Sequence, residues 1–327
     1  MTRCFLVAVA LLGASLAARY HARARPGQSN DGDDRSFAAR GVTLMMDGDL
    51  DGAIGVFQQV QRKHPQSPVG FVLEADAIWW KIYYYSADLI DPDVFDVATM
   101  KVTPYDARFD DVDEVAISKA EARIRARQDL ARSYLYAGFA HALRARLEGL
   151  RDRDLATAWA GKRMRAALLR ALAHDPSLTD AYLGIGIYNY FVDTLSPIVK
   201  LLSLFINLPR GSRTEGLEQL QLCAEKGELA GAEARFYLAK DYSRSHEREY
   251  EKSQRLFQEL QQEFPHNALW PMLIGTLDFR LGNPQRGEEI YRQVYERTAG
   301  KSSDVDVAVH RAASRALGRL QPEQKFP

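Results

Sequence analysis

A period of 34 residues constrains the fold of this chain more than any other feature of its sequence. In the C-terminal third, a small, an aromatic and an aliphatic residue recur at that spacing, in the pairs Ser253 and Gly287, Phe257 and Tyr291, and Leu260 and Val294. A fixed period of this length predicts helical hairpins, in which small residues let two helices approach and large residues fill the space between successive hairpins. Such hairpins bury their apolar faces by stacking on one another.

The same pattern is present near the N-terminus. Gly41 precedes Ala53 by 12 residues, and Phe57, Val60 and Pro65 follow at the expected positions. On these residues the chain resembles the tetratricopeptide repeat superfamily over about residues 34–300. The resemblance implies an all-α, tetratricopeptide-repeat-like solenoid of about six helix pairs, with two inserts and a C-terminal capping helix.

The charge balance argues against nucleic acid as a partner. The chain has 43 Lys and Arg residues and 43 Asp and Glu residues, so its formal net charge is zero. A protein that binds nucleic acid needs a basic surface to neutralise phosphates. We therefore expect no nucleic-acid partner.

The N-terminus has the features of an export signal. Arg3 precedes a run of apolar or small residues over 4–18, which is shorter than the ~20 residues that a membrane span needs. We expect a signal peptide over 1–18, with an uncleaved anchor as the alternative, and a flexible linker over 19–33. The solenoid then occupies 34–327, and the protein is expected to be exported and to be periplasmic or associated with the cell envelope.

Two inserts are predicted in the middle of the chain. The first, over about 83–111, is rich in Asp and Pro, and a helix over about 112–127 follows it. A helix pair is expected from about Leu130 to His174, and a charged capping helix over about 303–320 closes the array.

The second insert is an apolar helix over about 193–210, with Ser196 as N-cap and Pro197 in the first turn. Its large apolar side chains would lose much burial energy if they were left in water. The residues assigned to this interface are Ile198, Leu201, Leu202, Leu204, Phe205 and Leu208. Three covers would prevent this loss: the protein's own groove or a neighbouring helix, a membrane surface, and a partner or second copy.

No catalytic, cofactor or metal motif emerges. The seven histidines have no partner at metal-ligand spacing, and no phosphate loop, HExxH or GxSxG is present. Once the signal is removed, Cys223 is the one cysteine left, which excludes an intrachain disulfide and a cysteine-based metal site. We expect a protein that is not an enzyme and needs no cofactor or metal.

The inner helices of tetratricopeptide solenoids line a concave binding surface, and the resemblance places that surface here by repeat register. The residues it assigns to a partner-binding groove are Trp79, Ile187, Tyr190, Lys240, Arg244, Phe279 and Arg280. Aromatic and Arg side chains are typical anchors of protein interfaces. The alternative is that the inserts fill this groove from inside.

A narrower resemblance covers about residues 181–223. There a glycine-rich helix, an apolar helix that begins at a proline, and an Arg-Gly-Ser-Arg segment follow one another. This order is similar to that in a eukaryotic tetratricopeptide family linked to the outer mitochondrial membrane and to lipid-droplet-associated clearance of protein inclusions.

Together these features predict a non-enzymatic adaptor or scaffold of the cell envelope that binds a protein or peptide partner in a concave groove. One alternative is binding of a lipid, an apolar ligand or a membrane surface through the insert helix over 196–208. Another is a structural subunit of an envelope assembly.

Overall fold

The computed structural model describes residues 31–90, 102–194 and 208–320. Within these residues the chain forms thirteen helices. They are α1 (Asp31–Met46), α2 (Leu50–Lys63), α3 (Val69–Ser86), α4 (Asp106–Arg125), α5 (Leu130–Leu150), α6 (Asp154–His174), α7 (Ala181–Thr194), α9 (Arg213–Lys226), α10 (Gly231–Tyr242), α11 (Tyr250–Glu263), α12 (Leu269–Arg280), α13 (Pro284–Thr298) and α14 (Asp304–Leu320).

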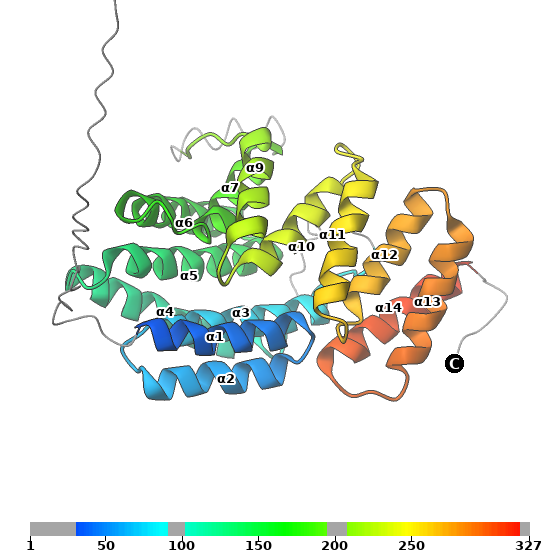
Figure 1. The fold of residues 1–327 in the computed structure, drawn as a ribbon, viewed down its shortest axis with the longest axis horizontal. Coiled ribbons are helices and arrows are strands. Elements are labelled where there is room, and N and C mark those ends of the chain that lie inside the picture. Colours follow the sequence, from blue (N-terminus) through cyan, green and yellow to red (C-terminus); the bar gives the residue numbers. More distant parts are fainter. Residues whose placement is uncertain (1–30, 91–101, 195–207, 321–327) are drawn as a thin grey trace, which may run out of the picture. The chain divides into compact units, whose positions relative to one another are not determined.

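The helices pack as six consecutive antiparallel pairs followed by α14 (Figure 1). The pairs are α1–α2, where Gly41 faces the Phe57 ring, and α3–α4, α5–α6, α7–α9, α10–α11 and α12–α13. This arrangement confirms the predicted all-α, tetratricopeptide-repeat-like solenoid.

Local sequence explains where several helices begin. Asp49 caps α2, because its side chain accepts a hydrogen bond from Gly52 N, and Gly48 before it adopts a positive φ of 94° in the turn. Ser212 caps α9 in the same way, because its hydroxyl oxygen accepts a hydrogen bond from Glu215 N at 3.3 Å.

The first insert is shorter than its expected bounds of 83–111. Helix α3 continues to Ser86 and α4 already begins at Asp106, six residues before the expected start at 112. The cause is tertiary: Asp106 accepts a hydrogen bond from Thr103 N and is paired with Arg151 of the next helix pair, which fixes the start of α4.

Other boundaries fall close to the expected ones. Helix α1 begins at Asp31, within the stretch expected as a linker, and α14 spans Asp304–Leu320 where a cap is expected over 303–320. The apolar insert helix expected over 193–210 lies mostly outside the described residues: α7 ends at Thr194, and Leu208 to Arg210 lead into α9. The expected signal peptide is also outside them.

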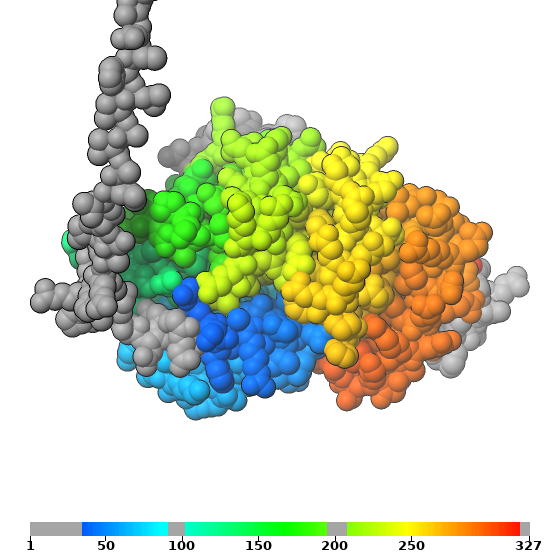
Figure 2. Space-filling view, viewed as in Figure 1, coloured from blue at the N-terminus to red at the C-terminus, as the bar shows by residue number. Residues whose placement is uncertain are grey.

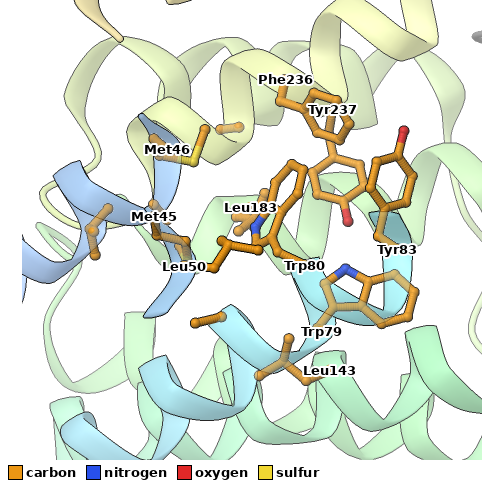
Figure 3. Close-up of a cluster of buried hydrophobic side chains, with 14 of the residues drawn as sticks. Met45, Met46, Leu50, Trp79, Trp80, Tyr83, Leu143, Leu183, Phe236 and Tyr237 are labelled. Carbon is orange, nitrogen blue, oxygen red and sulfur yellow. The ribbon is translucent and has the colours of Figure 1, made fainter. Parts of the chain in front are cut away.

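Helix α3 occupies the centre of the core. Fifteen of its eighteen residues are buried, which is the pattern of a helix that is covered on all sides. Figure 3 shows Trp79, Trp80 and Tyr83 of α3 in one cluster with Met45, Met46 and Leu50 from the first pair and Phe236 and Tyr237 of α10. The first helix pair, α3 and the C-terminal pairs therefore share one apolar core.

Candidate functional site

The concave positions are filled by the chain itself. Of the seven residues predicted to line a groove, Trp79, Tyr190, Lys240 and Arg244 are buried, and Ile187, Phe279 and Arg280 are partly exposed. On the face shown in Figure 2, the first helices in blue lie directly against the later helices in yellow and red. The four buried side chains have a packing role in this structure and are not open to a partner.

The segment that fills the concave side runs from Trp80 to Ile90. The rings of Trp80 and Phe236 lie 4.9 Å apart between centroids. Tyr84 donates a hydrogen bond to Asn267 Oδ1 at 3.2 Å, and Thr276 donates to the backbone oxygen of Ile90 at 3.1 Å. The described start of the first insert therefore covers the inner helices of the C-terminal pairs, as the filled-groove alternative predicts.

A buried ion cluster lies deeper in the same core. Arg146 of α5 is 2.6 Å from Glu233 and 3.6 Å from Asp76, and its guanidinium sits over the Tyr237 ring. Burial, together with the nearby Glu233 carboxylate, raises the pKa of Asp76 well above its ordinary value. The adjoining cavity of ≈ 30 Å³ has room for water only, so this cluster is a structural element of the core.

A second hollow, of ≈ 270 Å³, is lined by the α1–α2 turn and the residues that open α14. Its charged groups pair with one another. Lys81 lies 2.8 Å from Asp51 and 2.6 Å from Asp304. Asp47 accepts a hydrogen bond from His266 N at 2.8 Å. These contacts join the two ends of the solenoid.

Three of the predicted groove residues, Tyr190, Arg244 and Arg280, do converge at the connection between α10 and α11. We call the group around it the corner cluster; its members are Phe191, Arg244, His246, Tyr250 and Arg280, of which Arg244 is buried and the other four are at least partly exposed. The Arg244 guanidinium lies 4.8 Å from the centroid of the Phe191 ring and 5.7 Å from that of Tyr190. Arg280 donates to Ser243 O at 2.8 Å and lies 5.7 Å over the Tyr250 ring.

Two carboxylates form ion pairs that support the corner cluster. Asp241 pairs with Arg244 at 3.2 Å, and Glu247 pairs with Arg213 of α9 at 3.3 Å. Burial raises the pKa of Asp241 to about 7, although Arg244 and Lys240 oppose this shift. The ion pairs fix the loop between α10 and α11 in place and so set the positions of the rings and guanidinium groups above it.

Tyr190 and His246 form the one contact here that resembles a catalytic pair. Tyr190 Oη lies 3.0 Å from His246 Nε2. Burial raises the pKa of the Tyr190 hydroxyl, so it remains protonated. A buried neutral tyrosine that anchors a surface imidazole is suited to packing and recognition, and in the described residues no group of three His, Cys, Asp or Glu is arranged to hold a metal ion.

Sequence reasoning missed three members of the cluster, Phe191, His246 and Tyr250. His246 lies 56 residues from Tyr190, and only the packing of α7 beside α10 brings them together. Of the predicted insert interface, Leu208 is partly buried and packs on the core. The other five residues, Ile198, Leu201, Leu202, Leu204 and Phe205, lie outside the described residues.

Comparison with known proteins agrees with the fold of the first helix pair. A family model described as Tetratricopeptide repeat matches residues 39–67, which run from the middle of α1 to the end of the turn after α2. No curated protein matches the chain in sequence. Among the described helices, none combines the length and apolar character that a membrane crossing requires. The chain thus contains a tetratricopeptide repeat and has a tetratricopeptide-repeat-like α-solenoid fold.

Proposed function

We propose that the protein is a non-enzymatic adaptor of the cell envelope that binds a protein or peptide partner at the corner cluster. Tetratricopeptide repeats generally mediate protein–protein contacts, and this solenoid presents a different surface for that purpose because its concave side is occupied by its own residues 80–90. The export signal expected at the N-terminus supports a place in the envelope.

The observation that carries the proposal is the corner cluster itself. The exposed parts of Phe191, His246, Tyr250 and Arg280 gather around a short connection, and the buried Arg244 and two ion pairs, Asp241–Arg244 and Arg213–Glu247, hold that connection in place. Aromatic and Arg side chains that are already ordered lose little entropy on binding and dominate the energy of protein interfaces.

Site-specific photo-crosslinking tests this function. The photo-reactive residue p-benzoylphenylalanine replaces Tyr250 in the corner cluster or, as the control, Tyr85, an aromatic residue that is 54% exposed on α3. After irradiation in the envelope fraction of the producing cells, we expect a discrete protein adduct from position 250 and none from position 85. Arg280→Ala in the Tyr250 variant should remove the adduct.

Two results would contradict the proposal. One is that positions 250 and 85 give the same adducts, because the corner cluster would then have no special affinity for a protein. The other is that the protein is absent from the envelope fraction, because the expected location would then be wrong.

A further inference from the structure

The outer face of α6 has an unusual composition for a solvated surface. Leu155, Trp159 and Leu169 are 60%, 45% and 41% exposed, and no other described helix carries three exposed large apolar side chains. Residues at positions 155, 159, 162, 163, 166, 169, 170 and 173 share this face by helical spacing. We use the term outer face for Leu155, Trp159, Lys162, Arg163, Leu169 and Arg170.

The core does not need these side chains. Helix α6 packs against α5 and α7 through its opposite side, where Ala160, Met164, Leu168 and Ala171 are buried. The outer face therefore exposes apolar area without contributing to that packing, and exposed apolar patches mark contact surfaces more often than chance.

The charges on the outer face all have one sign. From residue 155 to 174 α6 contains four Lys or Arg residues and no Asp or Glu, in a chain with equal numbers of both signs. Among the described residues no ion pair includes Arg163 or Arg170, and the Arg170 guanidinium lies 5.5 Å over the Tyr134 ring of α5. The Lys162 ammonium lies 5.1 Å over the Trp159 ring, so a cation and an indole are presented together.

We propose that the outer face of α6 lies on the surface of an anionic phospholipid bilayer. Trp159 and Leu155 would enter the headgroup region, where an indole has both an apolar ring and a hydrogen-bond donor to satisfy. Lys162, Arg163 and Arg170 flank this apolar strip and face the lipid phosphates, while their aliphatic stems cover its edges. The contact is peripheral, with α6 parallel to the membrane plane, and it is separate from the corner cluster.

Vesicle sedimentation tests the electrostatic part of this contact. The full-length protein is mixed with vesicles of phosphatidylcholine alone or of phosphatidylcholine with phosphatidylglycerol, which gives the surface a negative potential. We expect binding to the anionic vesicles only. Arg163→Gln with Arg170→Gln should weaken it about thirtyfold, because each cation at such a surface contributes about fivefold in affinity.

The matched control removes the same charge elsewhere. Arg311→Gln with Arg315→Gln alters two exposed arginines on α14, of which Arg315 lies 3.9 Å from Asp88. This variant should bind as the unaltered protein does. An N-terminal apolar segment is present in every variant alike, so it cannot produce a difference between them.

Tryptophan fluorescence tests the apolar part. Of the four tryptophans, Trp79, Trp80 and Trp270 are buried and Trp159 is exposed. The difference spectrum between the unaltered protein and Trp159→Phe therefore reports on Trp159. On anionic vesicles it should shift to shorter wavelength, and lipids brominated on their acyl chains should quench it.

The proposal is overturned if the protein ignores anionic vesicles. It is also overturned if the two double variants bind equally well, or if Trp159 is not quenched in the bound protein, because another surface would then carry the contact. Binding of both vesicle types with equal strength would likewise contradict it, since the cations would have no role.

Discussion

At the scale of single residues, Asp241 should make stability depend on pH. Burial raises its pKa from the ordinary value of 3.8 to about 7, so the folded state holds the proton more tightly than the unfolded chain. The associated stability is complete below pH 3.8 and is lost as the pH rises through 7. Asp241→Asn should flatten this fall by up to about 1.4 kcal/mol per pH unit, as measured by urea unfolding at a series of pH values. Parallel curves for the two proteins would contradict the expectation.

The sequence predicts which residues face inward in the candidate groove, but it does not predict whether those residues are exposed. Repeat register identifies Trp79, Tyr190 and Arg244 as inward-facing, and all three are buried. Register cannot reveal that Trp80 and Tyr83 of α3 reach Phe236 of α10, because that contact joins residues about 150 positions apart that no period relates. The buried members of the predicted groove therefore belong to the packed interior and do not line an open surface.

At the scale of helices, the approach of α7 to α9 depends on a glycine. A Cβ atom added at Gly216 would lie 2.6 Å from Tyr190 N and 2.8 Å from Gly186 O, both backbone atoms. Gly216→Ala should therefore lower the free energy of unfolding by about 1–3 kcal/mol. Gly55→Ala is the matched control, because nothing lies within 4 Å of a Cβ there. It should raise the free energy by about 0.5–1 kcal/mol through helix propensity. Urea unfolding of both variants measures these changes. Equal changes in the free energy of unfolding would mean that α7 and α9 can move apart to accept a Cβ atom without loss of stability.

The periodicity of apolar residues predicted the positions of most helices. Tertiary contacts determined the boundaries that this periodicity did not predict. The α5–α6 pair is found where it is expected because its apolar residues recur over long, uninterrupted stretches. The acidic run that starts at Asp106 resembles a loop in sequence. In the structure Asp106 binds Arg151 and Asp113 binds Arg144, so α5 neutralises that run and allows α4 to begin earlier.

At the scale of the whole molecule, this solenoid departs from a one-dimensional array. In an ideal repeat protein each helix pair contacts only its neighbours, so damage at one end stays local. Here α14 also packs on α3, and Asp304 receives both the Lys81 ammonium at 2.6 Å and the Tyr105 hydroxyl at 3.0 Å. The C-terminal cap therefore covers an early helix pair as well as α13.

Hydrogen exchange should reveal this long-range coupling. In a chain that ends at Gly300, amides of α3 should exchange more than about tenfold faster, a factor that corresponds to about 1.4 kcal/mol of opening free energy. Asp304→Ala, which keeps α14, should give a smaller increase in the same helix, because only its polar contacts to Lys81 and Tyr105 are lost. The Arg311→Gln variant should leave α3 unchanged, since that arginine is exposed on the far side of the cap. Faster exchange confined to α12 and α13 would show that the repeats behave as a linear array after all, because an independent N-terminal half could not sense the loss of a helix more than 200 residues away.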